Sequence, residues 1–185
     1  MEPTAQLEEI LPRVITTVEG IRPDQLGDPT PCTEFTVSEV IDHMVVLGSQ
    51  FAYMFRGEEP PAIDAPAATT EVPVAEFRKA MDDLFDAVRS PGAMDRTISA
   101  PVGEMPGETF ARLVAFDGLV HGWDLATATG QDYDPPTEVV EAVASFAGGA
   151  ITPELRENGM FANPTTVPSG ATPLERLVAF SGRTL

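Results

Sequence analysis

Two side chains able to bind protons or metal ions, Asp117 and His121, are four positions apart in a segment with helical spacing of apolar residues. On an α-helix such a pair points in the same direction. A carboxylate and an imidazole within an apolar stripe lose hydration on burial, so they need each other, further hydrogen bonds or a metal ion. At about 100° per residue, the apolar residues within roughly 60° of Asp117 are Phe110, Leu113, Val114, Val120 and Ala128.

The chain contains only two histidines, and the second one, His43, lies at the edge of the apolar stripe of another predicted helix. In an antiparallel bundle the faces that carry His43 and His121 can meet in the core. Two imidazoles and one carboxylate form a ligand set that suits Zn²⁺, with Ni²⁺, Fe²⁺ or Mn²⁺ as alternatives. Three protein ligands leave a coordination position open for water or substrate, which is typical of catalytic sites. The residues alone equally allow a metal-free pair in which His121 neutralises Asp117.

Two further residues near this motif have side chains that bear on chemistry. Asp124 follows His121 by three positions, so it is a candidate for the second shell, where it would hold an imidazole N–H. The alternative is an ordinary acid near a helix end. Cys32 lies in a proline-rich loop, where we expect a small buried apolar side chain rather than a reactive thiol.

Composition narrows the class of protein. The 185 residues suit a single domain, 1–185, and 43% of them are hydrophobic, as in soluble globular proteins. The net charge of −18 argues against nucleic acid or an anionic membrane as a partner. A single cysteine and the absence of a basic, apolar leader predict a cytoplasmic protein. We therefore expect a small-molecule substrate as the partner, and a homodimer is compatible with a helical bundle.

Helical periodicity dominates the chain and predicts an all-α fold, with an up-down four-helix bundle, extra short helices and an irregular C-terminal segment. A capping box at Thr36 and Glu39 sets the start of the second helix, and Gly130 is suited to end the fourth. The predicted main helices cover residues 4–21, 36–56, 73–88 and 108–129, shorter ones cover 135–151 and 174–180, 57–70 is an irregular connection, and 94–106 could form a hairpin.

Several segments resemble a known family, the DinB/YfiT-like superfamily, and within it actinobacterial proteins related to the N-terminal domain of mycothiol-dependent maleylpyruvate isomerase. The most specific segment is residues 121–131, HGWDLATATGQ. Weaker similarities occur in the expected order along nearly the whole chain, at residues 30–37 (TPCTEFTV), 40–48 (VIDHMVVLG) and 173–183 (PLERLVAFSGR).

The resemblance implies a DinB-like four-helix bundle that holds a divalent metal through three side chains. Carried over position by position, the ligands are His43, Asp117 and His121, with Asp117 standing where the family has a glutamate. The resemblance also implies mycothiol as a candidate cosubstrate. In the true isomerase a separate C-terminal domain helps to form the substrate site, so we do not expect maleylpyruvate isomerisation itself from this chain.

Three functional hypotheses follow from the sequence. The first is a metal-dependent transferase or isomerase of small molecules that uses mycothiol. The second is a non-catalytic helical bundle with a buried pair of Asp117 and His121. The third is a hydrolase of thiol conjugates that acts through the same metal site.

Overall fold

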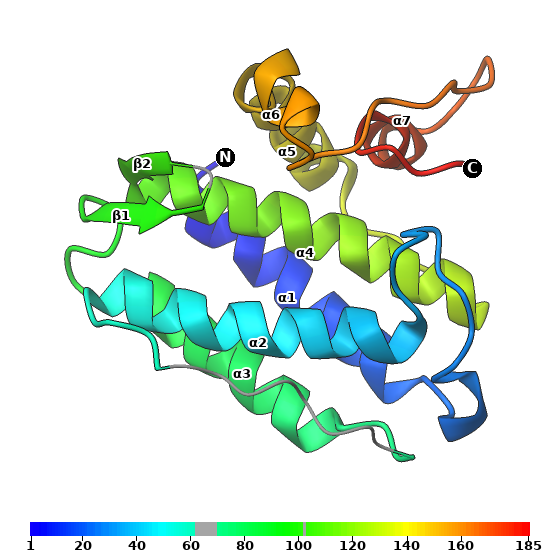
Figure 1. Ribbon diagram of the computed structural model, residues 1–185, viewed down its shortest axis with the longest axis horizontal. Helices are drawn as coiled ribbons and strands as arrows, with labels where there is room; N and C mark the ends of the chain where they lie inside the picture. The colour runs from blue at the N-terminus through cyan, green and yellow to red at the C-terminus, as the bar shows by residue number, and fades with distance from the viewer. Residues whose placement is uncertain (62–69, 102) are drawn as a thin grey trace.

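The computed structural model describes residues 1–61, 70–101 and 103–185, and its centre is an antiparallel bundle of four helices (Figure 1). The most extensive packing is between α2 and α3 and between α1 and α4, and α2 also packs on α4. The all-α, DinB-like bundle predicted from periodicity is confirmed. The four helices are α1 (Pro3–Glu19), α2 (Val37–Arg56), α3 (Val74–Val88) and α4 (Gly107–Thr129).

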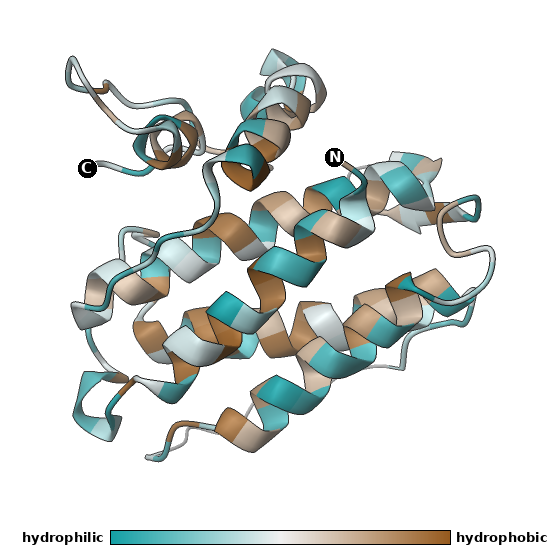
Figure 2. Ribbon diagram, turned by 180° about the vertical axis from the view of Figure 1, so that it is seen from behind, coloured by the Kyte–Doolittle hydropathy of each residue, from teal (hydrophilic) through white to brown (hydrophobic). Residues whose placement is uncertain are grey.

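The hydrophobic positions of the four helices lie on the faces that they turn toward one another, and many hydrophilic positions lie on the outer faces (Figure 2). The buried hydrophobic residues form one core cluster. The core includes Leu7 and Ile10 of α1, Ile41 of α2, Phe77 of α3 and Leu119 of α4, which are all fully buried. These residues recur at the three- and four-residue spacings from which the helices were predicted. The bundle therefore provides a rigid support for the polar side chains that project from α2 and α4.

Local signals account for the limits of α2 and α4. The Thr36 hydroxyl accepts a hydrogen bond from the Glu39 backbone N–H, and the Glu39 carboxylate accepts one from the Thr36 backbone N–H at 2.7 Å. This is the predicted capping box. Gly130, which follows α4, has a φ of 70°, a left-handed conformation that glycine adopts without steric cost.

A short antiparallel hairpin precedes α4 and lies against α2 and α4. Its strands are β1 (Thr97–Ala100) and β2 (Gly103–Pro106), with Ile98 opposite Met105. The predicted hairpin within 94–106 is thus confirmed. The predicted connection 57–70 lies largely outside the described residues, which resume at residue 70.

Three shorter helices follow the bundle, α5 (Thr137–Ala150), α6 (Pro153–Glu157) and α7 (Pro173–Phe180). They lie together on one side of the bundle, next to α4 (Figure 1). The sequence predicted α5 and α7 but placed a loop where α6 forms a single turn after Pro153. α7 contacts α4, and Arg183, which follows α7, hydrogen-bonds to Asp124 of α4. Within the described residues, no helix has the length and hydropathy that a membrane span would need.

Candidate metal centre

The structure brings the three predicted ligand residues together on facing sides of α2 and α4. The Oδ1 atom of Asp117 lies 3.5 Å from Nε2 of His121 and 3.8 Å from Nε2 of His43. The two imidazole rings are 5.0 Å apart between centroids and nearly perpendicular, at 69°. One ligand atom from each of the three residues lies within 4.8 Å of the others. Asp117 and His121 are neighbours because of their helical spacing, whereas His43 joins them through the packing of α2 on α4.

These spacings are longer than direct hydrogen bonds and leave room for a cation between the three groups. Hydrogen bonds to oxygen span about 2.7–3.2 Å between heavy atoms, and both distances to Asp117 are longer. Ligands about 2.0–2.1 Å from a tetrahedral Zn²⁺ are roughly 3.4 Å from one another. The observed gaps of 3.5 and 3.8 Å are close to that value. The aspartate side chain, although short, therefore brings its carboxylate within these distances of both imidazoles.

Asp117 is less enclosed than the apolar stripe suggested, since its side chain retains 33% of its exposure. It lines a cavity as well as facing His43 of α2. Burial raises the pKa of Asp117, but the electrostatic interactions of its carboxylate with His121, His43 and Arg183 outweigh this effect and leave the pKa below its usual range. The carboxylate is thus held ionised, as a metal ligand must be.

Asp124 is fully buried and contacts the side of the His121 ring that faces away from Asp117. Asp124 Oδ2 lies 3.0 Å from Nδ1 of His121, and the Asp124 side chain has no exposed surface. A carboxylate in contact with Nδ1 favours the tautomer in which Nδ1 carries the proton, which leaves the Nε2 lone pair directed at the cavity. The contact that the sequence predicted for Asp124 is therefore present.

Arg183, in the tail after α7, supplies the counter-charge to Asp124. Its Nη2 donates to Oδ2 of Asp124 at 2.7 Å and its Nε donates to Oδ1 at 3.1 Å. Burial lowers the pKa of Arg183, but the hydrogen bonds and charge of Asp124 outweigh this and raise it. Sequence reasoning missed this role. The only signal was that Arg183 closes the last of the family-like segments.

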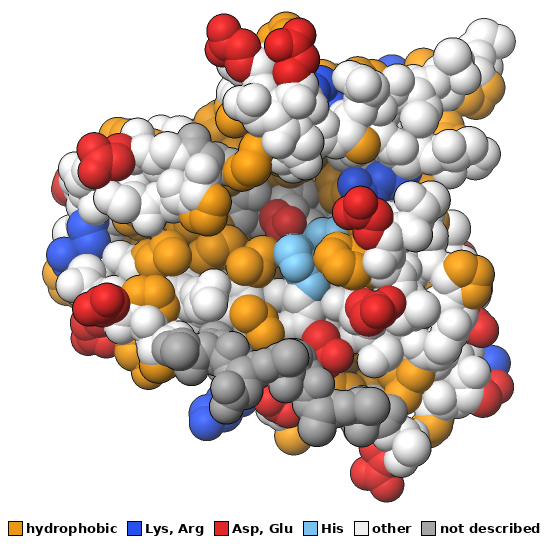
Figure 3. Space-filling model, in the orientation of Figure 1, with side chains coloured by type: hydrophobic (Ala, Val, Ile, Leu, Met, Phe, Trp, Pro, Cys, Tyr) orange, Lys and Arg blue, Asp and Glu red, His pale blue; other side chains and the backbone are white. Residues whose placement is uncertain are grey.

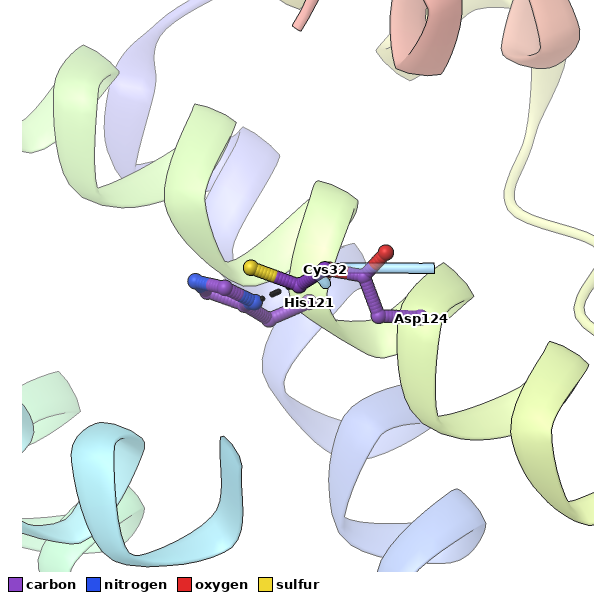
Figure 4. A group of neighbouring side chains, drawn as sticks. All are labelled: Cys32, His121 and Asp124. Carbon is purple, nitrogen blue, oxygen red and sulfur yellow. Dashed lines mark hydrogen bonds and ion pairs between the residues drawn. The ribbon is translucent and has the colours of Figure 1, made fainter. Parts of the chain in front are cut away.

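Cys32 lies beside the same imidazole, from the loop that precedes α2 (Figure 4). Cys32, His121 and Asp124 form a second group whose ligand atoms lie within 4.8 Å of one another. Two observations disfavour this group as a metal site. Asp124 is already engaged by Arg183 and by Nδ1 of His121, and burial raises the pKa of the Cys32 thiol. Cys32 is only half buried, so it forms part of a cavity wall rather than of the core.

The cavity above the three ligand residues has a volume of about 490 Å³ and polar as well as apolar walls. The Phe35 ring lies against both imidazoles, with centroids 5.3 Å from His43 and 6.4 Å from His121. Arg156, which also lines the cavity, lies over the ring of Phe180, at 4.5 Å. The volume suits a small-molecule ligand. In Figure 3 the two histidine side chains are visible in this hollow.

Gly122, which follows His121, lies where Tyr133 packs closely against α4. A Cβ atom on Gly122 would be 2.3 Å from the Tyr133 hydroxyl, closer than nonbonded atoms approach. Gly122 thus lets the segment after α4 pack directly against the helix. The helix is held in place from behind while His121 faces the cavity.

Residues 7–126 match the model of the family described as "Mycothiol maleylpyruvate isomerase N-terminal domain". The chain belongs to this family. The matched region contains all three candidate ligands and Asp124, whereas Arg156 and Arg183 lie beyond it. This family is DinB-like, as the resemblance at residues 121–131 indicated.

Two relatives in Mycobacterium tuberculosis, the uncharacterized proteins MT0763 and Rv0738 of two strains, are each 35% identical to the chain over 167 residues. The alignment covers 90% of this chain and 89% of theirs. A crystal structure of a mutant of the mycothiol-dependent maleylpyruvate isomerase matches with a TM-score of 0.63 at 13% identity. That match covers 77% of this chain and spans 66% of the isomerase chain, so it supports the fold alone.

Proposed function

We propose that the protein binds one divalent cation through His43, Asp117 and His121, and that it uses this cation in the thiol-dependent transfer or isomerisation of small molecules. The observation that carries the proposal is the convergence of the three ligand groups below a cavity of about 490 Å³, at distances that leave room for a cation. Zn²⁺ fits two nitrogens and one carboxylate oxygen, as do Ni²⁺, Fe²⁺ and Mn²⁺.

The thiol proposed is mycothiol, because the family and its structural neighbour are both described by that cosubstrate. When bound, a divalent cation acts as a Lewis acid that lowers the pKa of a coordinated thiol or polarises a carbonyl. The protein's own residues orient and enclose the reactants. Asp124 fixes the ring of His121, Arg183 balances the charge of Asp124, and Phe35 shields the imidazoles from water.

The first test is metal stoichiometry. Purified protein stripped of metal and titrated with Zn²⁺ in a calorimeter should bind one ion. His43→Ala and Asp117→Ala should each weaken binding by at least about a hundredfold, because each removes one of three ligands and the loss of an outer-shell partner already costs about 10–100-fold.

Cys32→Ala is the matched control, because the Cys32 sulfur lies within 4.8 Å of the same imidazole but is outside the proposed ligand set. It should leave Zn²⁺ affinity within about twofold, which is roughly 0.4 kcal/mol. If Cys32→Ala lost Zn²⁺ binding while His43→Ala retained it, the ion would instead be bound by the group of Cys32, His121 and Asp124. Absence of a bound ion in the unaltered protein would leave the alternative of a non-catalytic bundle.

A second measurement concerns the thiol. Protein loaded with Co²⁺ should develop a thiolate-to-cobalt charge-transfer band when mycothiol is added, and His43→Ala should not. A spectrum unchanged by mycothiol at saturating metal would contradict the role given to the thiol while leaving the metal site intact.

A further inference from the structure

A second cavity, of about 340 Å³, lies beside the first, between α2, α4 and the hairpin. The two cavities have five lining residues in common, so they meet at the candidate metal centre. In Figure 3 hydrophobic side chains extend from the two histidines toward the side of the molecule where β1 and β2 lie. The shared residues are His43, Phe116, Asp117, Met160 and Phe161.

The walls of this apolar cavity differ in character from those of the polar one. From α2 it is lined by Leu47, Phe51 and Met54, which are half buried and so present apolar surface to it. From α4, Leu113 faces it in the same way. Among the described lining residues Asp117 is the only acid, and there is no lysine or arginine. A charged ligand group placed there, away from the metal centre, would lose its hydration without a compensating partner.

The polar cavity has the complementary properties. Arg156, Arg183, Glu34 and Asn163 are in its walls, so it can satisfy the hydroxyl and amide groups of a hydrophilic thiol. A ligand bound at the centre therefore meets two different environments, one on each side. This arrangement suits a reaction that joins two reactants of different polarity.

We infer that the apolar cavity receives the uncharged, hydrophobic part of the second reactant, while the polar cavity receives the thiol. The inference rests on the proposed function for the reaction, but the cavity can be tested without it. An apolar cavity of about 150 Å³ holds a benzene molecule, so 340 Å³ suits a group of one or two fused rings or a chain of comparable volume. The second reactant is thus an electrophile with an aryl or alkyl arm.

The test compares the same substitution at two alanines. Ala100, in β1, lines the apolar cavity, whereas Ala144, in α5, lines a cavity of about 420 Å³ elsewhere on the molecule. N-phenyl-1-naphthylamine, an uncharged fluorescent probe of two-ring size, should bind the unaltered protein. Ala100→Trp should weaken probe binding at least tenfold, and Ala144→Trp should change it less than twofold. Replacing Zn²⁺ by Co²⁺ should quench the bound probe, because the cavity adjoins the metal centre.

A second pair of variants keeps the test valid if a tryptophan impairs folding. Leu113→Gln places an amide in the apolar cavity, and Leu174→Gln places one on α7, at a residue outside it. The probe should again distinguish the two variants by at least tenfold. Equal probe binding in both members of each pair would overturn the inference.

Binding of S-alkyl mycothiol conjugates tests whether one ligand can occupy both cavities. With Zn²⁺ bound, affinity should rise about threefold to fourfold for each methylene added from S-methyl to S-hexyl, as expected for burial of apolar surface. Ala100→Trp should abolish this rise and leave the S-methyl conjugate unaffected. No rise in the unaltered protein would also overturn the inference. If instead Zn²⁺ fails to bind while the probe still distinguishes the variants, the proposed function is refuted and the assignment of the apolar cavity as a binding site is still supported.

Discussion

The pair formed by Asp124 and Arg183 provides the most quantitative test of how the centre is held together. Arg183→Met removes the guanidinium and leaves the fully buried Asp124 with His121 as its remaining partner. Breaking a buried ion pair by removing one partner costs about 3–5 kcal/mol. Because His121 stays and the Arg183 side chain is 14% exposed, we expect the lower end, about 3 kcal/mol. For a chain of this size that corresponds to a fall in Tm of about 6–12 °C.

Urea unfolding of the metal-free protein, followed by circular dichroism, measures this loss as a shift in midpoint at constant slope. Arg22→Met is the control, because Arg22 pairs with Asp24 through side chains that are 63% and 72% exposed. It should cost less than about 1 kcal/mol. The double variant Asp124→Asn with Arg183→Met should cost less than the sum of the single changes, since it removes the buried charge itself. A loss for Arg183→Met no greater than for Arg22→Met would refute the view that Asp124 depends on Arg183.

Two further predictions concern packing and pH. Gly122→Ala should destabilise the protein by about 1–3 kcal/mol, because the new Cβ would lie 2.3 Å from the Tyr133 hydroxyl. Gly148→Ala is the control: a Cβ there meets nothing within 4 Å, so the change should stabilise α5 by about 0.5–1 kcal/mol. Equal urea midpoints for the two variants would contradict the proposed contact between Gly122 and Tyr133. A hydrogen bond from Arg56 lowers the pKa of Asp83, so the stability contributed by Asp83 is present above its unfolded pKa of about 3.9 and is lost as the pH falls through the folded value. The difference in Tm between the unaltered protein and Asp83→Asn should therefore be largest near neutral pH and shrink in acid, and a difference independent of pH would count against the pairing.

Local sequence signals were sufficient for most of the fold. The capping box at Thr36 and the glycine at position 130 fixed helix ends because they act within one turn. The apolar spacing in residues 108–129 predicted α4 within one residue. The single turn of α6 was missed, since five residues are too few to show a period.

The candidate site likewise has parts that follow from local sequence and parts that depend on tertiary packing. The alignment of Asp117 with His121, and of Asp124 behind His121, follows from the three- and four-residue spacing of one helix. The approach of His43 depends on how α2 packs on α4, which the residues allowed but did not determine, and the family resemblance favoured it. Arg183 is 59 positions from Asp124, and no periodicity connects a C-terminal tail to a helix that far away.

The net charge of the molecule and the lining of the apolar cavity together favour an uncharged second reactant. With the histidines neutral, the carboxylates of Asp117 and Asp124 outnumber the guanidinium of Arg183 by one. A divalent cation reverses the sign of that local charge. The rest of the molecule, with 29 acidic against 11 basic residues, attracts cations and repels small anions at a distance. Long-range attraction thus favours loading of the metal, whereas an anionic second reactant would be opposed on approach and unpaired in the apolar cavity. An electrophile with a neutral hydrophobic arm avoids both penalties.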